Sequence, residues 1–219
     1  MEKKTIVFFG DSLTQMNMDI SPDSDWKFGK AMGEGYVTYV SGILSNKYPE
    51  KFRYINAGIG GNKSVDLYAR IKHDVWQYCP DYLSIFVGIN DVLREVNPDF
   101  NDGVDDERFE WVYRTMIEQT LKRFEGVKII LVEPIILHAS RFSDEEYRVR
   151  RDGAERKSLI IDKLAKEFKL PYVRLQGIFD DLADKHGADL LLGDGVHTSP
   201  AGVYAIGQEW LKAFEEVLV

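Results

Sequence analysis

The stretch Thr5-Ile6-Val7-Phe8-Phe9-Gly10-Asp11-Ser12-Leu13-Thr14 decides the fold, because an uninterrupted apolar run ends there in a turn that carries a serine. Residues 5–9 are β-branched and aromatic, a composition typical of a short strand buried on both faces of a parallel sheet. In open α/β sheets, functional residues gather outside the carboxyl ends of the strands. We therefore expect Ser12 at that edge, as a candidate nucleophile.

Apolar runs and helical patterns alternate along the rest of the chain, which favours a parallel sheet with helices on both faces. The expected strands are residues 5–9, 53–57, 82–88, 128–133 and 171–175. The expected helices lie near residues 35–48, 64–78, 108–125, 147–168 and 200–216. With right-handed crossovers, this order predicts the α/β class and a three-layer αβα sandwich. No linker or repeat divides the chain, so residues 1–219 are expected to form a single domain.

Composition narrows the possible partners. The 219 residues hold 28 Lys and Arg against 36 Asp and Glu, and the net charge of −8 disfavours binding to nucleic acid or to an anionic membrane. The single cysteine, Cys79, excludes an internal disulfide framework. No segment approaches the ~20 apolar residues of a membrane span, and the start of the chain lacks a signal-peptide core. We expect a cytoplasmic protein with no membrane partner.

A serine nucleophile needs a base, and the chain has only four histidines to supply one. His73 and His186 lie in polar helical patterns, where surface positions are expected. His197 follows Asp194 by three residues in a predicted loop, so Asp194 could orient its ring for proton transfer from Ser12. Taken alone, the same pair could be an aspartate that caps a turn beside a surface histidine.

Backbone N–H groups and amides that could stabilise an oxyanion are expected after the second and third strands. The segment 56–62 (Asn-Ala-Gly-Ile-Gly-Gly-Asn) would let a backbone N–H approach a ligand closely. Its glycine spacing does not fit the nucleotide-binding pattern Gly-x-Gly-x-x-Gly. The segment 88–91 (Gly-Ile-Asn-Asp) places the amide of Asn90 at the same edge, although such a sequence is also typical of a simple turn.

Four motifs in order resemble the SGNH hydrolases, also called GDSL esterases. They are Gly10-Asp11-Ser12-Leu13, Gly60-Gly61-Asn62, Gly88-Ile89-Asn90-Asp91 and Asp194-Gly195-Val196-His197. The resemblance implies a five-stranded flavodoxin-like sheet, with Ser12 as nucleophile, His197 as base and Asp194 as its orienting group. It also implies an oxyanion hole made of Ser12, Gly61 and Asn90, and no metal or other cofactor. The Gly-x-Ser-x-Gly elbow of ordinary α/β-hydrolases is absent.

Within that family the chain looks most like the intracellular acetylxylan esterase type, through the segments 33–37 (Gly-Glu-Gly-Tyr-Val) and 89–92 (Ile-Asn-Asp-Val). The aromatic rings of Trp26 and Tyr36 could stack on a sugar, or could pack a loop onto its own domain. His138 and Arg141 follow the fourth strand at the same edge, where solvation alone would also explain them. The full set of candidate substrate contacts is Asp11, Trp26, Tyr36, Asp91, His138 and Arg141.

These residues predict an esterase that transfers short acyl groups, most simply acetyl, from xylo-oligosaccharides or similar small esters. A lysophospholipase or thioesterase for longer chains is the main alternative. A glycan-binding module of the same fold and a metallohydrolase using Asp11, Asp194 and His197 are two others. A homo-oligomer is compatible with the sequence, which does not fix the oligomeric state.

Overall fold

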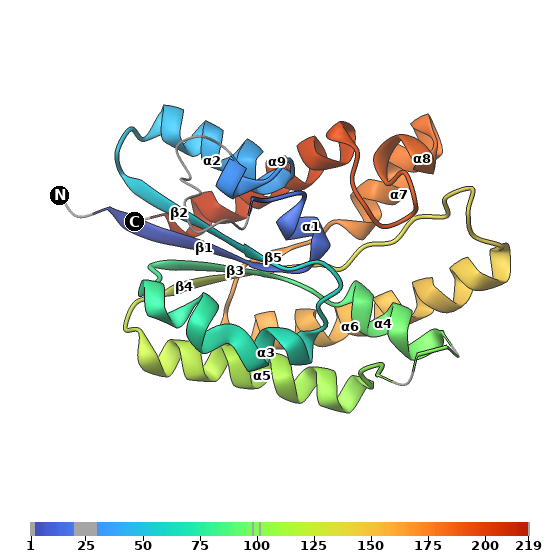
Figure 1. Ribbon diagram of the computed structural model, residues 1–219, viewed down its shortest axis with the longest axis horizontal. Coiled ribbons are helices and arrows are strands. Elements are labelled where there is room, and N and C mark those ends of the chain that lie inside the picture. Colours follow the sequence, from blue (N-terminus) through green and yellow to red (C-terminus); the bar gives the residue numbers. More distant parts are fainter. Residues whose placement is uncertain (1–2, 20–29, 98, 101, 219) are drawn as a thin grey trace.

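A five-stranded parallel sheet, in the order β2-β1-β3-β4-β5, forms the centre of the molecule (Figure 1). The computed structural model describes residues 3–19, 30–97, 99–100 and 102–218. The strands are β1 (Lys4–Gly10), β2 (Phe52–Gly58), β3 (Tyr82–Phe86), β4 (Lys128–Val132) and β5 (Tyr172–Val173). The predicted α/β class and parallel five-stranded sheet are confirmed.

Helices cover both faces of this sheet, so the molecule has three layers. In Figure 1, α2 and α9 lie above the sheet, whereas α3, α5 and α6 lie below it. The helices are α1 (Ser12–Gln15), α2 (Tyr36–Lys47), α3 (Ser64–Asp74), α4 (Ile89–Val96), α5 (Asp106–Arg123), α6 (Asp144–Phe168), α7 (Gln176–His186), α8 (Ala188–Leu191) and α9 (Pro200–Val217), with the short 3-10 turns η2 (Lys30–Met32) and η3 (Trp76–Tyr78). No helix in the described part of the chain is long and apolar enough to cross a membrane.

The first strand shows why both faces need a helical cover. Its side chains point alternately to opposite faces. Ile6 and Phe8 join the apolar cluster under α2 and α9, whereas Val7 and Phe9 join the cluster above α3 and α5. All four side chains are inaccessible to solvent. The polar turn that follows is therefore held at the end of a strand fixed from both sides.

Three predicted strands end earlier than expected. The fourth stops one residue early, at Val132, and the third and fifth stop two residues early for identifiable reasons. The third ends at Phe86 instead of residue 88, because Gly88 turns the chain with φ 145° straight into α4. The fifth stops at Val173 instead of residue 175. Beyond it, the carboxylate of Glu133 accepts hydrogen bonds from the backbone N–H groups of Leu175 (2.6 Å) and Gln176 (2.8 Å), and the chain turns into α7.

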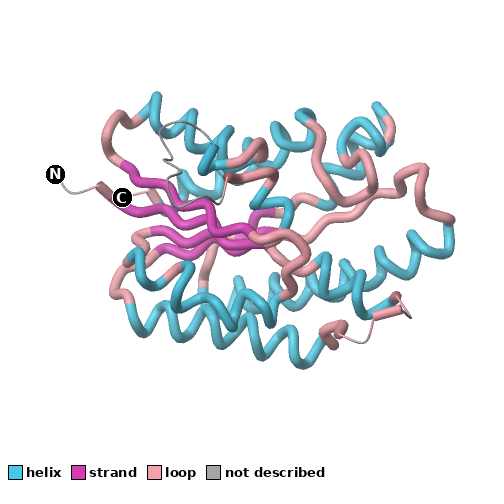
Figure 2. Tube along the Cα trace, in the orientation of Figure 1, coloured by secondary structure: helices cyan, strands magenta, loops and turns pink. Residues whose placement is uncertain are grey.

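The carboxyl ends of the strands face away from the N-terminus, and the segments that follow them gather on that side (Figure 2). The short helices α1 and α4, which the sequence patterns did not predict, begin there, directly after β1 and β3. Both carry residues of the predicted site in their first turns, namely Ser12 and Asn90. The topology thus places three of the four motifs at one edge of the sheet.

Candidate active site

Ser12, His197 and Asp194 form a continuous chain of hydrogen bonds at this edge. The Ser12 Oγ atom lies 2.9 Å from Nε2 of His197, and Nδ1 of the same ring lies 2.8 Å from Oδ2 of Asp194. Half of the His197 side chain is exposed to solvent. A bound ester could therefore reach the serine from outside the protein.

The position of Ser12 follows from the turn that ends β1. Asp11 is the N-cap of α1, and its Oδ1 accepts a hydrogen bond from the Leu13 backbone N–H at 3.0 Å. Gly10 is required at the turn, because a Cβ atom there would lie 2.4 Å from the Phe86 carbonyl oxygen. The amide of Asn56 on β2 donates to the Thr14 carbonyl at 2.8 Å and fixes the far end of α1. Two neighbouring strands thus set the orientation of the serine.

Asp194 accepts several hydrogen bonds from its own loop. Its Oδ1 accepts from the backbone N–H groups of Val196 (2.9 Å) and His197 (2.7 Å), while Oδ2 faces the His197 ring. Burial raises the pKa of Asp194, but these hydrogen bonds outweigh it and hold the pKa at about 2. Asp194 is therefore ionised across the neutral range, as a group that orients and stabilises an imidazolium must be.

The three expected oxyanion donors come from the segments that follow β1, β2 and β3. The Ser12 N–H opens α1 and the Gly61 N–H lies in the loop after β2; neither has an acceptor among the residues that the structure describes. Gly61 has φ +77°, a conformation that favours glycine. The Asn90 amide donates to the Asn62 carbonyl at 3.1 Å through one of its two N–H groups, which leaves a second for another acceptor.

Two of the motifs contain a buried carboxyl group, namely Asp11, which precedes Ser12 in the chain, and Asp91, which follows Asn90. Asp11 is 1% exposed, and its Oδ2 has no hydrogen-bond partner among the residues that the structure describes. Burial raises the pKa of Asp11 to about 7, with a smaller contribution from the charge of Asp91. Burial likewise raises the pKa of Asp91 to about 6, although that carboxylate accepts hydrogen bonds from the Ser64 hydroxyl and backbone N–H. At neutral pH a large fraction of Asp11 is therefore uncharged.

The expectation that Asp11, Tyr36 and Asp91 contact substrate is wrong, because all three side chains are at most 1% exposed. Tyr36 packs edge-on against the core rings of Phe8 and Phe86, so it cannot stack on a sugar. Asp91 instead binds the start of α3, as described above. Tyr36 is thus buried by packing against aromatic rings, and Asp91 is buried where it accepts hydrogen bonds from Ser64.

The two remaining candidates within the described residues, His138 and Arg141, make different contacts. The His138 ring stacks on Tyr147 at 4.7 Å, and its Nε2 lies 3.2 Å from the Phe142 carbonyl, so it faces the start of α6. Arg141 donates from Nη1 to Oδ2 of Asp194 at 3.2 Å, and its side chain remains 53% exposed. Trp26 lies outside the described residues.

The other two histidines, His73 and His186, are exposed, as the sequence predicted. Within the described ranges, no group of three His, Cys, Asp or Glu side chains is arranged to hold a metal ion. The side chains and N–H groups described above are suited to proton transfer and to hydrogen bonding of an anionic oxygen.

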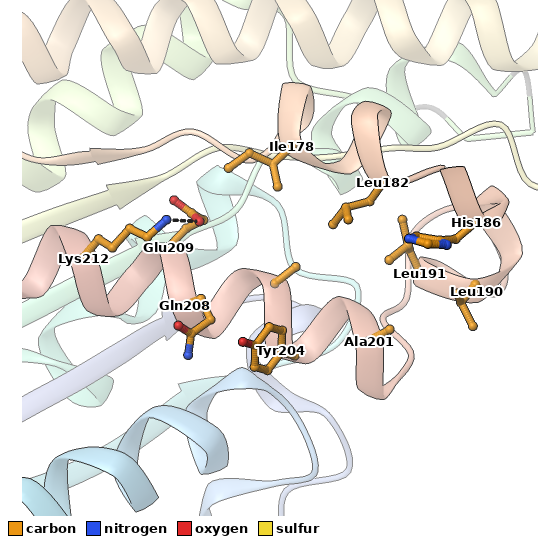
Figure 3. A pocket seen from close by; sticks show the side chains of 11 residues that line it. Ile178, Leu182, His186, Leu190, Leu191, Ala201, Tyr204, Gln208, Glu209 and Lys212 are labelled. Atoms are coloured by element: carbon orange, nitrogen blue, oxygen red, sulfur yellow. Dashed lines mark hydrogen bonds and ion pairs between the residues drawn. The ribbon is translucent and has the colours of Figure 1, made fainter. Parts of the chain in front are cut away.

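A separate hollow of about 450 Å³ lies between α7, α8 and α9 (Figure 3). It is largely apolar, with Leu190 and Tyr204 more than half exposed and a Glu209–Lys212 ion pair at one end. Ser12, Asp194 and His197 do not line it. The chain leaves this hollow at Leu191 and then forms the loop that carries Asp194.

Comparison with known proteins agrees with this geometry. The family model described as "GDSL-like Lipase/Acylhydrolase family" matches residues 8–205. The acetylxylan esterase of Geobacillus stearothermophilus is 32% identical over 95% of this chain and 96% of its own length. The isoamyl acetate-hydrolyzing esterase of Saccharomyces cerevisiae is 25% identical, over 98% of this chain and 87% of its own.

Solved structures show the same fold. A protein described as a GDSL-like lipase from Parabacteroides merdae superposes with a TM-score of 0.87 at 27% identity, covering 97% of both chains. The Geobacillus acetylxylan esterase gives a TM-score of 0.81 at 30% identity, covering 99% of this chain and 94% of its own. Structures of that enzyme include two described as catalytic mutants, in which a serine and an aspartate are replaced by alanine.

Proposed function

The chain belongs to the GDSL-like lipase/acylhydrolase family and is a carboxylic ester hydrolase, and we propose that it removes acetyl groups from xylo-oligosaccharides through an acyl-enzyme on Ser12. The observation that carries this proposal is the hydrogen-bonded chain Ser12–His197–Asp194, with 2.9 Å and 2.8 Å between successive groups. A serine hydroxyl becomes nucleophilic when an oriented imidazole can take its proton.

In the first half-reaction, Ser12 Oγ attacks the ester carbonyl carbon while Nε2 of His197 takes the hydroxyl proton. The carbonyl oxygen becomes an oxyanion, which accepts hydrogen bonds from the N–H groups of Ser12 and Gly61 and from the Asn90 amide. The tetrahedral intermediate collapses when His197 returns the proton to the departing alkoxide oxygen. The alcohol leaves and the acyl group stays on Ser12.

In the second half-reaction, water replaces the alcohol. His197 takes a proton from the water, the resulting hydroxide attacks the acyl carbon, and the same donors bind the new oxyanion. The Ser12 Oγ–carbon bond then breaks, and His197 protonates the serine oxygen. Asp194 stays ionised throughout, because its pKa of about 2 lies far below the working pH.

The acetyl group is supported by two relatives, whose names describe an acetylxylan esterase and an esterase that hydrolyses isoamyl acetate. A third relative, thioesterase 1/protease 1/lysophospholipase L1 of Escherichia coli, is 28% identical over 65% of this chain and 62% of its own length. The longer match favours the acetyl substrate over a long acyl chain. The sugar is proposed from the first of these relatives alone.

The nucleophile is tested by covalent labelling. An organophosphonate that carries a fluorescent reporter should label the wild-type protein once, and a Ser12→Ala variant should remain unlabelled and lose ester hydrolysis by ~10⁴ or more in kcat. Replacement of the exposed Ser140 by alanine serves as the control and should leave labelling intact. Near-normal turnover by Ser12→Ala would overturn the assignment.

The substrate is tested by comparing acetate release from acetylated xylo-oligosaccharides with hydrolysis of 4-nitrophenyl esters whose acyl chains increase from acetyl to dodecanoyl. We expect the highest kcat/KM for acetyl, with a decrease as the chain lengthens. A rise in kcat/KM toward the long chains would favour the lysophospholipase or thioesterase alternative. Binding of the oligosaccharide without acetate release would favour the glycan-binding module.

A further inference from the structure

The loop between β2 and α3, residues 59–63, carries the Gly61 N–H and is pinned on both sides of it. The Ile59 N–H donates to the Gly10 carbonyl at 3.1 Å, and the Gly60 N–H donates to Oε1 of Gln15 at 2.8 Å. On the far side, the Asn62 carbonyl accepts from the Asn90 amide at 3.1 Å. The loop is thus tied to the strand and the short helix that present Ser12, and also to α4.

The Asn62 side chain leads to one further residue, Arg70, in the middle of α3. Arg70 donates from Nε to Oδ1 of Asn62 at 2.7 Å. It also donates from Nη2 to the Gly10 carbonyl at 2.9 Å and from Nη1 to the Ala57 carbonyl at 2.8 Å. These two carbonyls are near the carboxyl ends of β1 and β2, so one guanidinium group joins the two strands and the loop.

The environment of Arg70 fixes this geometry. Its side chain is 15% exposed, and the guanidinium lies over the Phe9 ring with 4.5 Å to the ring centroid. Asp74, one turn further along α3, accepts a hydrogen bond from Nη1 at 2.7 Å and supplies the opposite charge. A planar guanidinium can direct donors to several fixed acceptors at once, which a lysine ammonium on a flexible stem cannot do.

We propose that Arg70 is a positioning residue for the oxyanion hole: it fixes the Asn62 side chain relative to the Gly10 carbonyl and thereby sets both the Gly61 N–H and the Asn90 amide against Ser12. The inference rests on the proposed function, since it presumes that these donors bind the oxyanion. Arg70 itself does not touch the reacting atoms. Gly10 directly precedes the turn that carries Ser12. Through the Gly10 carbonyl, the Arg70 side chain therefore fixes the position of the donors relative to the nucleophile.

Misplaced oxyanion donors should affect kcat and KM differently. Donors that are aimed at the oxyanion stabilise the transition state more than the bound ester, so their misplacement lowers kcat with little effect on KM. Both half-reactions pass through an oxyanion at the same place, and both should slow together. A loss of substrate binding would instead raise KM.

The test is the variant Arg70→Lys, measured on 4-nitrophenyl acetate well below its melting temperature. We expect kcat to fall by ~10- to 100-fold, on the scale of displacing reacting groups by about 1 Å, with KM changed by less than about threefold. Arg114→Lys is the matched control, because Arg114 also makes ion pairs, with Glu110 and Glu167, but lies on α5 away from the site. It should stay within twofold of the wild-type protein.

A second variant keeps the test meaningful should Arg70→Lys fold poorly. Asn62→Ala removes the side-chain oxygen that accepts a hydrogen bond from Arg70. It leaves intact the hydrogen bonds from Arg70 to the carbonyls of β1 and β2. It should reproduce the loss in kcat. When either variant is combined with Asn90→Ala, the losses should multiply only in part, because one of the two donors that Arg70 positions is already absent.

Three results would overturn the positioning role: kcat within twofold of wild type in both variants, a rise in KM at unchanged kcat, or losses that multiply fully with Asn90→Ala. They differ from a failure of the proposed function, for which an active Ser12→Ala protein is the sign. An inactive Ser12→Ala protein together with fully active Arg70→Lys and Asn62→Ala proteins would reject only the role of Arg70.

Discussion

His197 and Asn90 act on different atoms in the proposed mechanism, so their loss should differ in size. His197→Ala removes the base from the 2.9 Å contact with Ser12 and should lower kcat by ~10⁴ or more. Asn90→Ala removes one of three oxyanion donors and should lower kcat by ~10² to 10³. Steady-state kinetics on 4-nitrophenyl acetate would measure both. Equal losses in the two variants would contradict the separate roles.

Asp11 makes stability depend on pH through its burial. The folded protein holds the Asp11 proton up to about pH 7, whereas an unfolded chain releases it near the ordinary pKa of 3.8. Between these values the folded state binds more protons, so the free energy of unfolding falls as pH rises. Asp11→Asn cannot ionise, and we expect its stability relative to wild type to improve steadily from pH 4 to about pH 7 and to level off above that pH.

Urea unfolding at several pH values would measure this difference. Burial of the new amide N–H₂ group without a partner adds a cost of about 1–3 kcal/mol. That cost is the same at each pH. The prediction is therefore tested by how the difference in unfolding free energy between variant and wild type changes with pH, and not by the size of the difference at any one pH. Glu155→Gln, an exposed carboxylate on α6, is the control and should show no comparable slope. A flat difference for Asp11→Asn would mean that Asp11 is already ionised in the folded protein at low pH.

The sequence indicates Ser12, Asp194, His197, Gly61 and Asn90 as candidates because each lies in a short motif after an apolar run or before a helix. It gave no sign of Arg70, which looks like any arginine in a polar helix until β1 and β2 end beside it. The prediction that Asp11, Tyr36 and Asp91 contact substrate was wrong because residue type does not reveal burial. The hydrogen bonds of Arg70 and the burial of the wrongly predicted residues both depend on contacts between segments that are distant in the sequence.

At the scale of elements, the start of α6 depends on a capping box that the sequence contains but periodicity alone did not locate. The Ser143 Oγ accepts from the Glu146 N–H at 3.3 Å, and Glu146 accepts from the Ser143 N–H at 3.0 Å. The helix therefore begins at Asp144, three residues before the expected start. Elements with a strong apolar period were predicted well, whereas α1 and α4 are too short to show one.

Ser143→Ala should lower the free energy of unfolding by about 0.5–2 kcal/mol, because the first turn of α6 loses a side-chain acceptor. Ser143→Asp supplies a carboxylate acceptor at the same position and should retain most of the stability. Chemical denaturation of both variants would check this. An alanine variant as stable as wild type would indicate that solvent already replaces the cap.

At the scale of the whole molecule, the net charge of −8 acts on every charged substrate that approaches the site. Fields of this kind lower the local concentration of like-charged ligands, and salt weakens them: the screening length falls from about 30 Å at 0.01 M to about 10 Å at 0.1 M. Close to the serine, however, the half-exposed Arg141 supplies a positive charge beside Asp194. The distant field and the local charge therefore act on an anionic ester in opposite directions.

Salt dependence separates these two effects. For 4-nitrophenyl hemisuccinate, whose acyl group carries one negative charge, we expect kcat/KM to rise ~2- to 10-fold between 0.01 M and 0.3 M salt, because screening removes the repulsion from the net charge. The neutral 4-nitrophenyl acetate should change little over the same range, and this controls for general salt effects on the enzyme. A fall in kcat/KM for the anionic ester would show that attraction by Arg141 outweighs the net charge. In that case Arg141→Gln should reverse the sign of the salt dependence.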